Sequence, residues 1–161
     1  MTKSGQHRSL RDAFSQYATG VTVVTARNAA GLPVGLTANS FASVSLEPPL
    51  VSWCIDKAST RYKELVAAEY YSISVLNESQ QNLSNLFAFR SWDDTVFDEV
   101  EWYEGPHGVP QFPDVGARFH CKQEHQYPGG DHLILVGRVE SYESDAHTSL
   151  VFFQGKYKTI D

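Results

Sequence analysis

Short runs of β-branched and other apolar residues follow one another along most of this chain, and they limit its fold more than any other feature does. Turns or short helical patterns separate the runs, and Pro48-Pro49 breaks the chain between two of them because proline donates no hydrogen bond to a sheet. The runs do not alternate with long helices as βαβ units do, so they predict a mostly β, antiparallel barrel with a few short helices. The expected strands are residues 21–25, 34–37, 41–46, 50–55, 70–76, 115–124, 132–142 and 150–153.

A first helix is expected to begin at Ser9, because Ser9 and Asp12 have the spacing of a capping box. Four apolar residues then recur at helical spacing and make one stripe: Leu10, Ala13, Phe14 and Tyr17. Gly20 is a suitable end for this helix. We therefore expect a flexible head at residues 1–8 and a single domain at 9–161.

Two more helices and one long loop are expected in the middle of the chain. One helix opens at Ser59 or Thr60, and the other follows Asn77. Residues 91–113 show no regular pattern and carry many acids, and loops of this length are often functional.

Composition excludes several classes of protein. The 161 residues include 13 basic and 19 acidic side chains, a formal charge of −6, which disfavours a nucleic-acid partner. No stretch reaches the ~18 apolar residues of a membrane span, and two cysteines do not suggest a disulfide framework. The expectation is a cytoplasmic protein with neither a nucleic-acid nor a membrane partner.

Common catalytic and cofactor motifs are missing from the sequence. It lacks the glycine fingerprint of a Rossmann site, a phosphate-binding P-loop, a serine elbow and the H-E-x-x-H zinc motif. His120, Cys121 and His125 lie close in sequence, but neighbouring residues of a strand point to opposite faces, so no metal site is predicted.

Three segments remain as candidates for binding. The first places Thr37, Ala38, Asn39 and Ser40 between two apolar strands, where donors and acceptors stand beside a residue small enough for a flat ring to approach. A simple turn with Asn39 in the left-handed conformation explains this segment equally well.

The second and third segments each have a plain structural explanation as well. Ser59-Thr60-Arg61 offers two hydroxyls and a guanidinium for a phosphate monoester, or merely caps a helix. The glycines before Asp131 and His132 permit a tight turn that presents the histidine at the start of a strand. A histidine in this position is often only a solvent-exposed side chain without a functional role.

Taken together, these segments resemble one family. The stretches 18–25 (ATGVTVVT) and 37–51 (TANSFASVSLEPPLV), followed by Ser59-Thr60, Phe87-Ala88, Gly130-Asp131-His132 and 152–157 (FFQGKY), resemble the flavin reductase-like domain. Members include the small reductase components of two-component flavin-dependent monooxygenases, such as the 4-hydroxyphenylacetate and phenol hydroxylases.

The resemblance implies an FMN-binding split barrel, an antiparallel Greek-key barrel that forms a homodimer and takes FMN or FAD with NADH or NADPH. Carried over residue by residue, it assigns Thr37, Ala38, Asn39 and Ser40 to the isoalloxazine and ribityl chain. It places Cys54, Ile55 and Asp56 beside the ring, and Ser59, Thr60, Phe87 and Ala88 at the phosphate. His132 would lie near the nicotinamide, and Tyr157 at the border of the site. The chain departs from many relatives at Trp53 and Leu133, two positions that bear on which flavin or nicotinamide fits.

The implied activity is an NAD(P)H:flavin oxidoreductase that passes a hydride to flavin and supplies reduced flavin to a separate oxygenase. No side chain is assigned as an acid or base, because ring stacking and oriented donors suffice for hydride transfer. Three other functions stay open on the sequence. They are reduction of a ferric chelate or cobalamin through a bound flavin, a non-catalytic flavin module, and a small-molecule-binding barrel.

Overall fold

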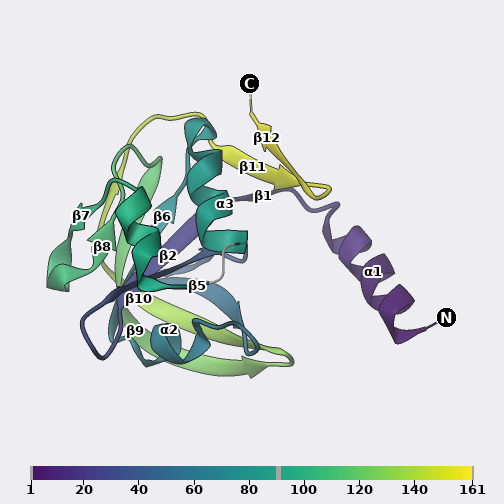
Figure 1. Ribbon diagram of the computed structural model, residues 1–161, viewed down its shortest axis with the longest axis horizontal. Coiled ribbons are helices and arrows are strands. Elements are labelled where there is room, and N and C mark those ends of the chain that lie inside the picture. Colours follow the sequence, from purple (N-terminus) through teal and green to yellow (C-terminus); the bar gives the residue numbers. More distant parts are fainter. Residues whose placement is uncertain (1, 90–91, 161) are drawn as a thin grey trace.

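A seven-stranded antiparallel sheet forms the body of the protein in the computed structural model, which describes residues 2–89 and 92–160. The strand order is β3-β2-β6-β9-β10-β5-β4, and every pairing is antiparallel. The mostly β, antiparallel architecture expected from the sequence is confirmed (Figure 1). The strands are β2 (Thr22–Arg27), β3 (Pro33–Ala38), β4 (Ala42–Leu46), β5 (Pro49–Asp56), β6 (Tyr70–Val75), β9 (Ala117–Gly129) and β10 (His132–Ser144).

The sheet curls on itself, and its two edges meet at a seam. The edge strands β3 and β4 are consecutive in the chain, since β3 ends at Ala38 and β4 begins at Ala42. Three residues can join opposite edges of a seven-stranded sheet only if the sheet closes into a barrel. The two strands are not paired with each other in the sheet, so the barrel is open along a line that residues 39–41 cross.

Short elements complete the fold. The small sheets contain β1 (Thr19–Gly20), β11 (Leu150–Phe153) and β12 (Lys156–Thr159), and β7 (Tyr103–Glu104) with β8 (Pro110–Gln111). The helices are α1 (Lys3–Phe14), α2 (Tyr62–Ala67) and α3 (Gln81–Phe89), with short 3₁₀ helices η1 (Glu78–Gln80), η2 (Asp94–Glu99) and η3 (Pro106–Gly108). The loop expected at 91–113 is therefore partly ordered into short elements, and its first residue lies outside the described part of the chain.

Both faces of β2 are buried, which explains why residues 22–25 are β-branched without interruption. Val24 and Ala26 face the barrel interior, where they pack with Trp53 and Tyr71. Val23 faces the other way, into a second cluster that α3 and residues 92–115 cover. A strand buried on both faces reads as an apolar run rather than as an alternation.

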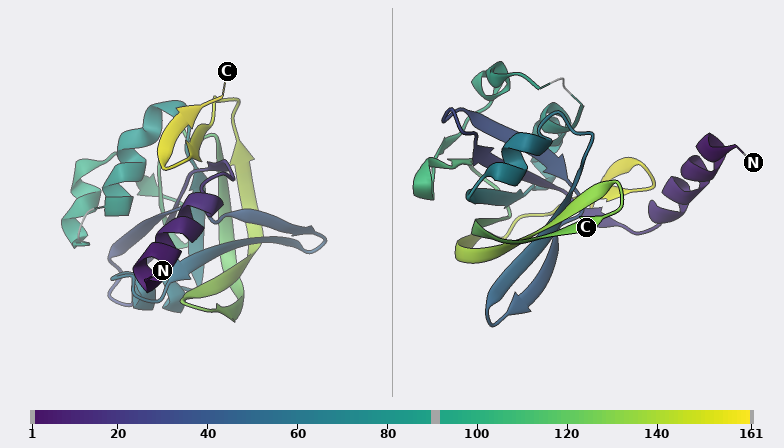
Figure 2. Two further views of the ribbon diagram at one scale, coloured as in Figure 1. Left: turned by 90° about the vertical axis from the view of Figure 1, so that its right-hand side faces the viewer. Right: turned by 90° about the horizontal axis from the view of Figure 1, so that it is seen from below.

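Helix α1 differs from the expectation in both its position and its packing. It begins at Lys3 because Thr2 caps it, with the Thr2 hydroxyl accepting a hydrogen bond from the Gly5 amide, so most of the expected flexible head is helical. It ends at Phe14 rather than near Gly20. None of its residues is buried, and it extends away from the barrel (Figures 1 and 2). None of the helices in residues 2–89 and 92–160 is long and apolar enough to cross a membrane.

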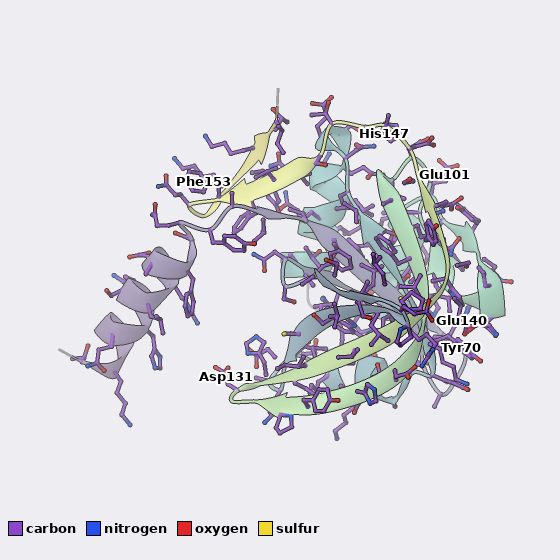
Figure 3. The ribbon with its side chains drawn as sticks, turned by 180° about the vertical axis from the view of Figure 1, so that it is seen from behind. Tyr70, Glu101, Asp131, Glu140, His147 and Phe153 are labelled. Atoms are coloured by element: carbon purple, nitrogen blue, oxygen red, sulfur yellow. The ribbon has the colours of Figure 1, made fainter. Side chains whose placement is uncertain are left out.

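Two histidines hold η3 against the sheet. The Nδ1 atom of His107 lies 3.1 Å from Nε2 of His120, and the two rings are nearly parallel. His107 also stacks on Tyr70 at 3.7 Å between ring centroids. The His120 ring lies on the opposite face of β9 from Cys121, which is in the barrel core. This cluster is remote from Asp131, and Figure 3 shows Tyr70 and Glu140 at the other end of the sheet.

The fold should become less stable in mild acid because of His120. Burial lowers the pKa of His120, the neighbouring His107 lowers it further, and Glu140 opposes both effects. The folded protein therefore binds this proton less readily than the unfolded chain does. The resulting stability is present above the unfolded pKa of about 6.5 and is lost as the pH falls through the folded pKa.

Chemical denaturation at several pH values tests this. Between pH 7 and 5, the wild type should lose more unfolding free energy than His120→Gln does. The exposed His147 provides the control, and His147→Gln should follow the wild type. An equal acid loss in His120→Gln and the wild type would show that His120 is not responsible.

Candidate functional site

Two adjoining hollows lie along the seam of the barrel, and we call them together the seam groove. The smaller has a volume of about 130 Å³ and is lined by Val21, Thr37, Asn39, Ser84, Ala88, Phe152 and Tyr157. The larger, of about 810 Å³, lies between α1 and residues 39–42. Asn39 and Phe152 line both, so the two hollows are neighbours.

Hydrogen bonds tie three elements into one wall of the groove. The Thr37 hydroxyl on β3 donates to the Ser84 carbonyl on α3 at 2.6 Å. The Ser84 hydroxyl in turn lies 2.8 Å from the Tyr157 hydroxyl on β12. These bonds fix the spacing of three elements that are far apart in sequence, so the polar lining of the groove is already formed.

Ser84 and Phe152 line the groove although neither is among the site residues expected from the sequence. Ser84 stands three and four residues before Phe87 and Ala88, a spacing that puts the three on neighbouring faces of one helix. That spacing could have identified Ser84. Phe152 reaches the groove through the pairing of β11 with β1, which no local pattern indicates.

Ser40 links the seam to the neighbouring strand rather than offering a free hydroxyl. Its Oγ accepts from the Cys54 amide at 2.9 Å and donates to the Cys54 carbonyl at 3.3 Å. Burial raises the pKa of the Cys54 thiol, and the Ser40 contact opposes this only in part. The thiol therefore stays protonated near neutral pH. Asn39 is not in the left-handed conformation, so the simple-turn explanation does not describe this segment.

Two of the selected side chains point into the core instead of the groove. Ala38 is 7% exposed and Ile55 is 1% exposed, and both belong to the barrel interior. Side chains alternate along a strand, so Thr37 and Asn39 face the groove while Ala38 faces inward. Ala38 and Ile55 could contact a ligand only through their backbone.

The segments selected for phosphate binding are brought together by Arg61. Helix α2 begins at Tyr62, so Ser59 and Thr60 precede it and do not open it as expected. The Arg61 guanidinium donates to the Phe87 carbonyl at 2.5 Å and lies 4.9 Å from the centre of the Trp92 ring. The Phe87 ring is fully buried, so of this pair Ala88 presents its side chain to the groove.

His132 starts β10 immediately after a two-residue turn. Gly130 has a φ of +70°, a conformation that glycine adopts without strain, and this turn places His132 directly opposite Asp56 in the pairing of β10 with β5. The ring donates from Nδ1 to the Asp131 carboxylate at 2.8 Å, and this contact lowers the pKa of Asp131. Figure 3 shows Asp131 at the tip of the hairpin. Cys54, Asp56 and His132 thus share one end of the barrel, which Ser40 connects to the groove.

The lining chemistry fits a flavin. A flat ring needs an aromatic or small apolar surface and donors for its polar edge, which Phe152, Ala88 and the amide of Asn39 provide. No group of three or more potential metal ligands occurs within residues 2–89 and 92–160.

Comparisons with known proteins agree with this chemistry. The family model "Flavin reductase like domain" matches residues 14–161. The chain is 47% identical over 152 residues to a "Probable flavin reductase" of Rhizobium meliloti, covering 94% of this chain and 48% of the relative. It is 42% identical over 152 residues to the reductase component of the flavin-dependent trigonelline monooxygenase of Acinetobacter baylyi, again covering 94% and 48%. The chain thus spans about half the length of these two relatives.

A solved structure shows the same fold. The NADH:FAD oxidoreductase of Streptomyces globisporus, in complex with NAD and FAD fragments, superposes with a TM-score of 0.90 at 35% identity. The match covers 100% of this chain and 96% of that one. The split-barrel architecture and the resemblance noted in the sequence are both confirmed, and the chain belongs to the flavin reductase like domain family.

Proposed function

We propose that this chain is an NAD(P)H-dependent flavin reductase that reduces FMN or FAD by hydride transfer. The proposal rests on the seam groove, whose polar lining is already held in place by hydrogen bonds. The family of the chain agrees with it. A flavin bound there supplies the hydride acceptor, and NADH or NADPH supplies the hydride.

The side chains of the site bind and orient the flavin and the nicotinamide, and none of them is needed as an acid or a base. Thr37, Asn39 and Ser40 line the ring and ribityl positions, and Cys54 with Asp56 continues this surface. Ser59, Thr60 and the end of α3 face the phosphate, and Tyr157 closes the border through its contact with Ser84. Holding the flavin and nicotinamide rings in the correct orientation at reacting distance accounts for a large part of the rate enhancement of hydride transfer.

The purified chain should oxidise NADH or NADPH only when FMN or FAD is present. A steady-state matrix of the two flavins and the two nicotinamides identifies the preferred pair. Flavin binding without nicotinamide oxidation would instead indicate a flavin module. Activity confined to a ferric chelate or cobalamin would indicate another acceptor.

His132→Ala should raise the KM for NAD(P)H more than the KM for flavin. His132 is placed by its turn and by Asp131 at the end of the barrel, away from the hollow that Ser84 and Tyr157 enclose. A loss of one positioning contact corresponds to about tenfold in KM. Steady-state kinetics measures both constants, and a larger change in the flavin KM would remove His132 from the nicotinamide position.

Reduced flavin is proposed to diffuse to a separate oxygenase. The support is that matching relatives are named as reductase components of the stachydrine N-demethylase and of the trigonelline monooxygenase. Mixing the chain with a candidate oxygenase should couple NAD(P)H oxidation to hydroxylation. Hydroxylation by this chain alone would contradict the proposal. We also propose a cytoplasmic location, in keeping with two free thiols.

A homodimer is the proposed assembly, and α1 is the element that supports it. Leu10 is 52% exposed and Phe14 is 68% exposed on a helix that touches little of its own barrel. Exposed apolar stripes of this kind mark protein interfaces, and a second copy is the occupant that the family resemblance implies.

Leu10→Glu should therefore convert a dimer into a monomer in light scattering. Arg8→Gln makes the same charge change on another face of α1 and should leave the dimer intact. A monomeric wild type, or a dimeric Leu10→Glu variant, would contradict an interface built on this stripe.

A further inference from the structure

Arg61 is a buried cation next to the last turn of α3, the helix that presents Ala88 to the seam groove, and it joins two segments that lie far apart in sequence. The residue is 3% exposed. Its guanidinium donates to the carbonyl of Phe87 in the last turn of α3, and its face covers the ring of Trp92. Trp92 packs against both hydrophobic clusters, so Arg61 is held against a well-packed part of the molecule.

The same residue determines where the turn at 59–61 lies. The Arg61 amide donates to the Ser59 hydroxyl oxygen at 3.2 Å, so that oxygen is occupied as an acceptor. The Ser59 hydroxyl hydrogen remains available to donate to an anion. Arg61 therefore sets both the position of the turn relative to Ala88 and the direction in which Ser59 donates.

Charge adds a second effect. The chain carries a formal charge of −6, so an anionic ligand meets an unfavourable overall field unless a local cation compensates. Arginine keeps its charge inside proteins, and charges interact more strongly where water is excluded.

We propose that Arg61 is a positioning residue that makes the groove select flavins bearing a phosphate. It holds the Ser59-Thr60 turn against the end of α3 and supplies the local positive charge. The proposal rests on the proposed flavin reductase function and adds a discrimination between FMN and riboflavin, which differ only in the phosphate.

Kinetics with FMN and riboflavin tests the proposal. The wild type should have a KM for FMN about tenfold below that for riboflavin, the ratio expected for one charge-assisted contact. Arg61→Met should raise the KM for FMN about tenfold and leave the KM for riboflavin within about twofold. Arg61→Lys keeps the charge but loses the planar fork, and it should recover part of the preference.

Two further measurements separate this role from a merely structural one. Lys63→Met makes the same charge change at an exposed neighbour and should alter neither KM. Inorganic phosphate should compete with FMN but not with riboflavin in the wild type. If Arg61→Met does not fold, Arg61→Lys decides, because FMN and riboflavin constants that rise together in it would overturn the proposal.

The failure of this inference can be told apart from the failure of the proposed function. A wild type that reduces FMN and riboflavin with equal KM overturns the proposed role of Arg61 but does not affect the proposed reductase function. A wild type that reduces none of riboflavin, FMN and FAD removes the function itself.

Discussion

An Ala88→Phe variant will fold like the wild type and lose most of the proposed flavin reductase activity. Ala88 is exposed on α3 and lines the smaller hollow of the seam groove, whose volume is about 130 Å³. A phenyl ring there occupies the space between Thr37 and Tyr157 without disturbing the core. We expect kcat/KM for flavin to fall about 100-fold, the scale of a ligand held out of its reacting position.

The effect should appear in binding as well as in turnover. Flavin fluorescence titration should show a weakened complex, while thermal unfolding stays within a few degrees of the wild type. Ala29→Phe places the same ring on an exposed turn remote from the groove and should retain full activity. Unchanged flavin kinetics in Ala88→Phe would show that the ring is not bound at this hollow.

Gly137→Ala will be among the most destabilising single-methyl additions in the chain. A Cβ at this position of β10 would lie 2.9 Å from Cζ of Tyr71 and 3.0 Å from the Cβ of Cys121. Tyr71 and Cys121 are both fully buried, and the Tyr71 ring packs edge-on against Trp53. Because none of these groups has room to move, we expect a loss of about 3 kcal/mol of unfolding free energy.

Denaturant titration measures this loss, and two further variants locate its cause. Gly20→Ala adds a methyl group with nothing within 4 Å and should be nearly neutral. The Tyr71 hydroxyl is the atom nearest to the added methyl, so Tyr71→Phe should recover part of the stability in the Gly137→Ala background. Additive effects of the two substitutions would show that the clash with Tyr71 is not what destabilises the variant.

The strands of the seven-stranded sheet could be predicted from the sequence because each carries its own pattern. The run around Val23 and Val24 is β-branched on both faces, and Pro49 marks the start of β5 after a break. Helix α1 was harder, since Ser9 and Thr2 both precede a plausible first turn and only the three-dimensional geometry shows that Thr2 is the cap. Strands β1 and β12 have two and four residues, too few for a periodic pattern.

The part of the candidate site that lies in one continuous segment could be predicted from the sequence. The contacts between segments that are distant in sequence could not. The run from Thr37 to Ser40 stands out because polar residues interrupt apolar strands. The inward direction of Ala38 follows from strand alternation, which could have been applied to this run. In contrast, the contact of Ser84 with Tyr157 joins residues 73 positions apart, and no local pattern contains such information.

The seam described above gives the barrel a mechanical property that a fully hydrogen-bonded cylinder lacks. Strands β3 and β4 are not paired with each other in the sheet, so the wall can widen there without breaking a ladder. Under the proposed function, a flavin bound across the seam would contact both unpaired edges. Flavin binding is therefore expected to make the barrel wall stiffer along this line.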